Sequence, residues 1–377
     1  MNCDFDYDIL EARSIVWGLI MELKDYIVKT RFSNRDGYIR CLSDYSNLDT
    51  TDYLFLEGYD DIKNLGMGDR RAYPSDYAVM NGALCMNDGS AWQWLRTYGY
   101  RYHDYIDSIG TNTTHGEAGV CETSAVICPK TMLDLSAVID AQKKHNIFEI
   151  TPTVDEKGEI LYHTIKFAAF PQCRAKNSAE LEMLYNIGKI HPTGKKYYGY
   201  INDKSIVHQN PEFEFGGKKY VRVIANTNSY TTNYKDHTPA PIAGTPVWAE
   251  VQPISWKIRN WEELPQSINP NGSSDAKTID VRSEDGLLSG TPFNTKDDYN
   301  TYHDGKEYRM WQNSIIRAIL NGYNIHEELM KGNGSMEFAG PYSYNYNFKG
   351  HGFLQEAFDD SKVSHTTMSH EDDELTI

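Results

Sequence analysis

The stretch EFEFGGKKYVRV (residues 212–223) predicts how this chain folds. Two runs in which apolar and polar residues alternate flank the pair Gly216-Gly217. Alternation with a period of two is typical of strands that are buried on one face. A glycine pair between two such runs is typical of a tight hairpin turn. The stretch therefore predicts two neighbouring antiparallel strands.

Strand patterns of this kind recur along the chain, and only a few segments have helical spacing. Helices are expected at residues 8–28, 177–190 and 310–330, where apolar residues return every three or four positions. Short helices among antiparallel strands and long loops predict an α+β fold and not a parallel α/β fold.

A boundary near residue 148 divides the chain into three parts. We expect an N-terminal lobe (1–148), a C-terminal lobe (149–360) and an acidic tail (361–377). The tail is expected to be solvated, with no fold of its own.

The net charge of the chain is −16, which disfavours two classes of partner. Binding to nucleic acid needs an excess of Lys and Arg. An anionic membrane surface would repel the chain as well. No run approaches the roughly 18 apolar residues that span a bilayer. We therefore expect neither nucleic-acid binding nor membrane insertion.

The start of the chain predicts synthesis in the cytoplasm. It lacks the basic region and the small-residue cleavage site of a signal peptide. The cysteines show no CxxC spacing, so reduced thiols are expected. The six are Cys3, Cys41, Cys85, Cys121, Cys128 and Cys173. A role outside the cell stays open, because virion proteins are assembled inside the host and act outside it.

A series of motifs between residues 160 and 360 resembles, in order, a domain family of bacteria and phages. The motifs are FAAFPQ (167–172), ELEMLY (180–185), EFEFGGKKYVRV (212–223), VWAEVQPISWKI (247–258), WQNSIIRAILNG (311–322) and FLQEAF (353–358). The core of this family resembles C-type lectins and the formylglycine-generating enzymes. The resemblance implies a C-type-lectin-like fold of antiparallel sheets, with Trp256 and Trp311 in its core.

The later motifs of the family stand earlier in this chain. They are YPSDYAVMNGAL (73–84), WQWLRT (92–97) and VICPKTMLDL (126–135). Either the domain is permuted or two partial modules stand in tandem. Two packed lobes are the favoured reading, because the N-terminal piece of about 150 residues has a long helix of its own.

The resemblance implies that the chain recognises a protein or a glycan. The related variable proteins of diversity-generating retroelements do so through diversified loops, in a phage virion or on a bacterial surface. Two other functions stay open: an enzyme of the formylglycine-generating kind, and a structural virion component whose Tyr-rich faces are subunit contacts. Self-association stays open as well.

The residues after position 91 are the first candidates for a binding surface. Aromatic residues and one arginine occupy every second position from 92 to 102, so they would share one face of a continuous strand. Such a face is rich in the residue types of binding hot spots. The alternative is that Trp92 and Trp94 are core residues, which moves the expected surface to Tyr98 and beyond.

Two loops, 110–117 and 339–352, are rich in Tyr, Asn, Ser, Gly and His, as are the binding loops of antibodies. The alternative is that they are ordinary solvent-exposed loops. The expected binding residues are Arg96, Tyr98, Tyr100, Tyr102, His103, Tyr105, Asn112, His115, Tyr342, Tyr344, Tyr346 and His351.

Catalysis has weaker support in the sequence. Cys121 and Cys128 are the nearest pair to the paired cysteines of formylglycine-generating enzymes, but their spacing puts them on opposite faces of a strand. Buried inert thiols are the favoured reading. We find no nucleotide-binding, GxSxG or HExxH motif. NTKDDYN (294–300) lacks the spacing of an EF-hand. The sequence therefore predicts a non-enzymatic protein with no catalytic residue, metal or cofactor.

Overall fold

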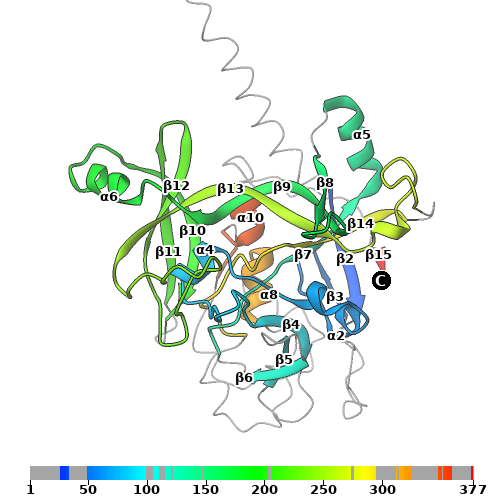
Figure 1. The fold of residues 1–377 in the computed structure, drawn as a ribbon, viewed down its shortest axis with the longest axis horizontal. Helices are drawn as coiled ribbons and strands as arrows, with labels where there is room; N and C mark the ends of the chain where they lie inside the picture. The colour runs from blue at the N-terminus through cyan, green and yellow to red at the C-terminus, as the bar shows by residue number, and fades with distance from the viewer. Residues whose placement is uncertain are drawn as a thin grey trace, which may run out of the picture.

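The computed structural model describes residues 26–33, 49–98, 105–109, 115–119, 122–145, 148–202, 206–272, 276–293, 311, 314–323, 347–349, 351–358 and 375–376. These residues form a mixed α+β structure of mostly antiparallel sheets with short helices, as the sequence predicts (Figure 1). Among them, no helix is both long enough and apolar enough to cross a membrane.

The hairpin predicted at residues 212–223 is formed by β11 (Val207–Phe215) and β12 (Lys218–Ile224). Phe215 pairs with Lys218, so the two glycines alone make the turn. Gly216 and Gly217 have φ angles of 60° and 76°, in the left-handed region that glycine adopts without strain. The two-residue loop therefore fixes the register of both strands.

This hairpin is part of a nine-stranded sheet in the order β1–β7–β14–β13–β12–β11–β10, with β9 paired to β13 and β8 to β9. All of these pairs are antiparallel. The remaining strands are β1 (Ile27–Val28), β7 (Lys130–Asp134), β8 (Ile150–Val154), β9 (Ile160–Arg174), β10 (Pro192–Ile201), β13 (Pro246–Ile258) and β14 (Thr278–Ser283).

Strand β13 organises the sheet because it has three partners. Its first half pairs with β12, and its last three residues pair with β14. Its other edge pairs with β9 over nearly its whole length. In Figure 1, β9 and β13 arch over the molecule, with β10–β12 at one end and β8 and β14 at the other. Helices α8 (Ile315–Asn321) and α10 (Phe353–Phe358) lie beneath this arch.

Two small sheets complete the strands. One contains β2 (Thr30–Ser33), β3 (Asp49–Asp52) and β15 (Leu375–Thr376). The end of the acidic tail thus pairs with β2, so the prediction that the tail has no structure is wrong at residues 375–376. The open edge of β2 supplies backbone hydrogen-bond partners, which the composition of the tail does not reveal. The other small sheet contains β4 to β6 and is described below.

Two helices begin at a serine whose side chain caps them. Ser75 Oγ accepts a hydrogen bond from Ala78 N–H at 3.1 Å at the start of α4 (Asp76–Met80). Ser314 caps α8 in the same way, and Gly322 ends it with a φ of 70°. The other helices are α2 (Tyr59–Ile62), α3 (Met67–Arg70), α5 (Leu135–His145), α6 (Ser178–Asn186) and the 3₁₀ helix η2 (Trp261–Glu263).

The prediction of a helix at residues 8–28 is wrong at its C-terminal end. Ile27 and Val28 form β1 and pair with β7, because tertiary strand pairing overrides the helical spacing there. Residues 8–25 lie outside the described part of the chain.

One sheet and one apolar core run across residue 148. Strand β7 from the first expected lobe pairs with β14 from the second. Trp94 belongs to the same core cluster as Trp256 and Trp311. All three indoles are at most 1% exposed, which confirms the core position that the resemblance implies for the last two.

Candidate recognition site

The segment expected to bind a ligand forms a three-stranded antiparallel sheet of its own. Strand β4 (Gln93–Tyr98) pairs with β5 (Tyr105–Ile109), and β5 pairs with β6 (His115–Gly119). In Figure 1 this sheet lies at the edge of the molecule opposite the arch of β9 and β13.

Four of the expected binding residues lie in this sheet: Arg96, Tyr98, Tyr105 and His115. Tyr98 is paired with Ile106, Tyr105 with Gly119, and His115 with Ile109. The structure thus brings together Tyr98 and His115, which are 17 positions apart in the sequence. Tyr100, Tyr102, His103 and Asn112 lie outside the described residues, as do Tyr342, Tyr344 and Tyr346.

The first part of β4 is the base of this sheet and is buried on both faces. Every residue from Gln93 to Thr97 is buried. Trp94 packs against Phe293, with 5.9 Å between ring centroids, and Trp92 is partly buried against the same core. The alternative that the two tryptophans are scaffold residues is therefore confirmed.

Arg96 is also part of the base, not of an exposed binding face. Its side chain is 7% exposed, and its Nη1 donates to Asp61 Oδ2 at 3.2 Å. Asp61 Oδ2 accepts a second hydrogen bond, from the backbone N–H of Gly58 at 2.6 Å. The expectation of one exposed face was wrong here, because both faces of β4 are covered and its register against β5 shifts between Trp94 and Tyr98.

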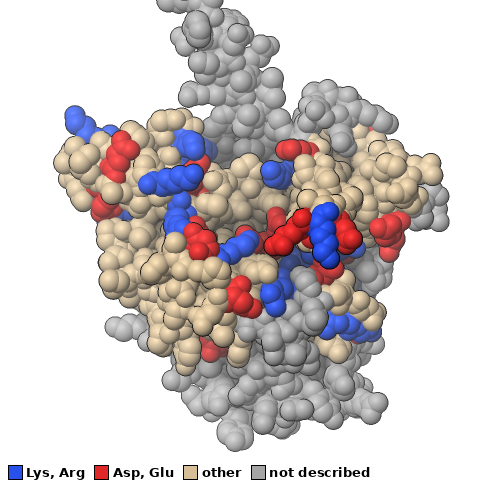
Figure 2. Space-filling view, viewed as in Figure 1, with Lys and Arg blue, Asp and Glu red and all other residues tan. Residues whose placement is uncertain are grey.

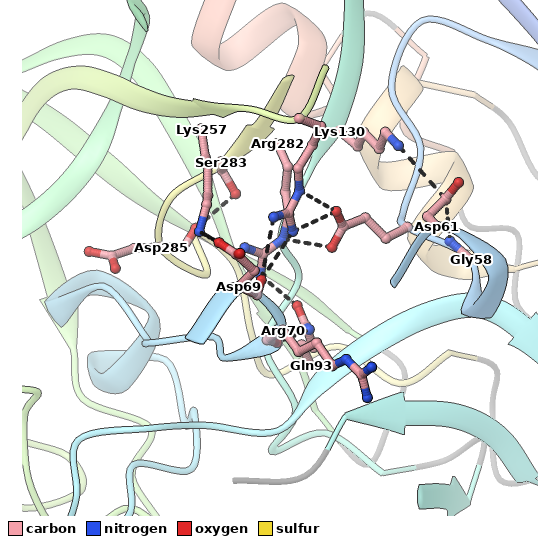
Figure 3. A network of polar contacts seen from close by, with 12 residues as sticks. Gly58, Asp61, Asp69, Arg70, Gln93, Lys130, Lys257, Arg282, Ser283 and Asp285 are labelled. Atoms are coloured by element: carbon pink, nitrogen blue, oxygen red, sulfur yellow. Dashed lines mark hydrogen bonds and ion pairs between the residues drawn. The ribbon is translucent and has the colours of Figure 1, made fainter. Parts of the chain in front are cut away.

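Lys130 on β7 continues this network into the main sheet (Figure 3). Its Nζ lies 3.8 Å from Asp61 Oδ2 and 3.0 Å from Asp280 Oδ2 on β14. Burial alone would raise the pKa of Asp61, but the charges of Lys130 and Arg96 outweigh burial and lower it. Burial alone would lower the pKa of Lys130, but the charges of Asp280 and Asp61 outweigh burial and raise it. Both groups are therefore ionised near neutral pH.

Glu57 forms a second centre of the network. Its side chain is 3% exposed and lies between two arginines of the main sheet region. Arg259 Nε donates to its Oε1 at 2.6 Å, and Arg282 Nε lies 3.1 Å from its Oε2. Such a carboxylate is stable in the interior only because both arginines compensate its charge.

Gln93 ties this centre directly to the base of the candidate sheet. Arg282 Nη2 donates to Gln93 Oε1 at 2.5 Å, and Gln93 Nε2 donates to the carbonyl of Arg70 at 2.8 Å. The backbone N–H of Arg96 also donates to the carbonyl of Glu57. The network of Glu57, Asp61, Lys130, Arg259 and Arg282 therefore holds β4 rigidly on β7 and β14.

No spacing in the sequence assigns these charged residues to one network. Its only signal is a charged residue inside an apolar strand, as at Lys130, Lys257 and Arg282. Lys257 pairs with Asp69, and its Nζ lies 3.7 Å from the ring centroid of Tyr162. Figure 2 shows that acidic and basic side chains gather in a band across the middle of this face, where they alternate and no single sign dominates.

The second expected patch is described only at its end. His351 is exposed, and its Nδ1 lies 3.1 Å from the carbonyl of Lys349. Phe348, three residues earlier, is buried and packs edge-on against Tyr198, with 6.3 Å between centroids. The turn that carries His351 is thus attached to β10.

The cysteines that are described show the features of inert thiols. Cys85 and Cys128 are buried, and burial is the main cause that raises both pKa values, to about 11 for Cys85. Cys173 is exposed, and its thiol pKa is also raised, mainly by partial desolvation and then by the charge of Asp76. Cys121 and residues 294–300 lie outside the described part, and within that part no group of His, Cys, Asp and Glu is arranged to hold a metal.

Comparison of the chain with protein-family models, with curated proteins and with solved structures found no match.

Proposed function

We propose that this protein recognises a protein or glycan ligand through the sheet β4–β6 and the loops at its ends, on a C-type-lectin-like scaffold. One observation carries the proposal. Strand β4 is buried from Gln93 to Thr97 and is joined to the main sheet by ion pairs and hydrogen bonds, and Tyr98, Tyr105 and His115 lie at its end and on the neighbouring strands β5 and β6. A rigid base below loops of adaptable composition is the arrangement that recognition proteins use.

We infer further that the two halves form one permuted domain. The motif at 126–135 supplies β7, and β7 pairs with β14, which follows the motif at 247–258. Tandem modules would each need to close a sheet and a core of their own, whereas the core cluster here draws on residues from Ile27 to Phe358. A phage virion or bacterial surface as the setting, and diversification of the loops, are parts of the same proposal and rest on the sequence resemblance.

A paired set of variants tests the recognition proposal. The wild-type chain is applied to an array of glycans and to an array of purified cell-surface proteins, beside the double variant Tyr100→Ala, Tyr102→Ala. The variant is expected to lose at least tenfold in affinity for any array feature that the wild type binds. If both tyrosines bind ligand and do not pack in the core, the free energy of unfolding should change by less than about 0.5 kcal/mol, the usual range for exposed positions.

Tyr230→Ala is the matched control, because Tyr230 is 65% exposed in the loop between β12 and β13, outside the proposed site. It should bind as the wild type does. Equal loss of binding in the control, or a large loss of stability in the double variant, would count against the proposed site.

A further inference from the structure

Helix α10 carries one buried carboxyl group, that of Glu356. Glu356 is 4% exposed, and its Oε2 accepts one hydrogen bond, from the backbone N–H of Tyr198 on β10 at 2.8 Å. Its Oε1 is buried and has no hydrogen-bond partner. Among the described residues, no Lys, Arg or His forms an ion pair with it. The neutral form of the acid is therefore favoured in this position.

The surroundings of Glu356 are apolar or already paired. From β9, Phe170 packs against Phe353 of α10, with 4.9 Å between ring centroids. From α8, Arg317 pairs with Asp52. From α4, the hydroxyl of Tyr77 donates to the carbonyl of Tyr198 at 2.7 Å.

Strand β10 carries Lys195, whose charge lowers the pKa of Glu356 without outweighing its burial. Lys195 lies over the ring of Tyr197, 5.0 Å from its centroid. The Tyr198 hydroxyl is hydrogen-bonded to Thr291 Oγ1 at 2.6 Å. Burial, only partly offset by the Tyr198 N–H and the charge of Lys195, raises the pKa of Glu356 to about 8.

We propose that Glu356 is a proton-dependent latch: its neutral carboxyl holds α10 on β10, and its ionisation releases α10 together with the turn that contains Phe348 and His351. The turn moves with the helix because Glu356 N–H donates to the carbonyl of Gly352 at 2.9 Å. The same turn is attached to β10 through Phe348 and carries His351. The latch goes beyond ligand recognition and holds whether or not the sheet β4–β6 binds a ligand.

The direction of the effect follows from the raised pKa. The folded state holds a proton on Glu356 that the unfolded chain releases above about pH 4.5. Stability contributed by the protonated group is therefore lost as the pH rises from about 4.5 towards 8. Opening of the latch therefore becomes steadily more favourable as the pH rises to about 8, and no more favourable above it.

Hydrogen–deuterium exchange of the full chain between pH 6 and 9 tests the latch, after correction for the intrinsic pH dependence of exchange. Protection of the Tyr198 amide and of residues 353–358 should fall about tenfold for each pH unit between 6 and 8 and level off above pH 8, because the exposed carboxyl is already ionised in this range and the buried one ionises only near pH 8. Glu356→Gln, which keeps the shape and cannot ionise, should show a flat profile. Glu212→Gln is the control: Glu212 is also buried, but both of its oxygens accept hydrogen bonds, from Thr193 and Tyr197.

The control is expected to keep the wild-type fall at α10. A wild-type profile without a fall, or a fall that persists in Glu356→Gln, would overturn the proposal. If Glu356→Gln does not fold, the wild type alone decides: a fall confined to α10 and β10 supports the latch, and an equal fall in β12 contradicts it.

Discussion

Glu57 shows how strongly one buried charge depends on its neighbours. An isolated carboxylate at its position would be very unfavourable, because the interior solvates charge poorly. Arg259 and Arg282 compensate it from two elements, so the side chain links the segment before α2 to β14 and to the end of β13. Removal of the carboxylate leaves two buried guanidinium groups without their main partner.

We predict that Glu57→Ala lowers the free energy of unfolding by about 3–5 kcal/mol, the usual effect of breaking a buried ion pair on one side. Urea unfolding at pH 7 measures it. Lys63→Ala is the control, because Lys63 pairs with Asp60 at 2.7 Å on the surface, where both side chains are about two-fifths exposed. That change should stay within about 0.5 kcal/mol. Similar losses in the two variants would show that the Glu57 network does not stabilise the fold.

Trp256 is a buried apolar residue whose contribution to stability can be tested in the same way. The indole is fully buried, stacks on Phe167 with 4.8 Å between centroids, and donates from Nε1 to the Phe167 carbonyl at 3.0 Å. Trp256→Ala should therefore cost about 3–5 kcal/mol of unfolding free energy. Ile242→Ala, at a side chain that is 77% exposed, should change it by less than about 0.5 kcal/mol. A soluble Trp256→Ala protein with an unchanged urea midpoint would refute the core position.

At the scale of single elements, the sequence predicted what local chemistry decides. The hairpin of β11 and β12 and the helix α6 both follow from neighbouring residues. The end of the first expected helix could not be predicted in this way. Ile27 and Val28 have helical spacing with the residues before them, but β7, which begins at residue 130, supplies their backbone partners.

The turn of the hairpin offers a sharp test at this scale. Gly217 has a φ of 76°, and no atom lies within 4 Å of a Cβ built on it, so backbone conformation alone opposes a side chain. Gly217→Val should cost about 1–2 kcal/mol of unfolding free energy, since a branched side chain disfavours the left-handed region. Gly217→Asn should cost clearly less, because Asn tolerates this region. Equal costs in urea unfolding would mean that the turn changes its conformation.

At the scale of the whole molecule, pairing between distant strands determines which residues of the candidate site are buried, and local sequence patterns did not predict this. Alternation from 92 to 102 predicted one aromatic face, yet β4 is buried on both faces as far as Thr97. Arg96 was expected at a binding surface and instead pairs with Asp61 inside the base. The grouping of Tyr98, Tyr105 and His115 in one sheet depends on the pairing of β5 with both neighbours, which no local pattern specifies.

The central claim is that loops on the sheet β4–β6 bind the ligand while the base below them carries the stability. A chain in which residues 99–104 and 110–114 are replaced by Gly-Ser segments of equal length tests both parts on the glycan and protein arrays. We predict that it unfolds at the wild-type urea midpoint and loses the array features that the wild type binds. A replaced chain that keeps those features, one that no longer folds, or a wild type that binds neither array would contradict the account.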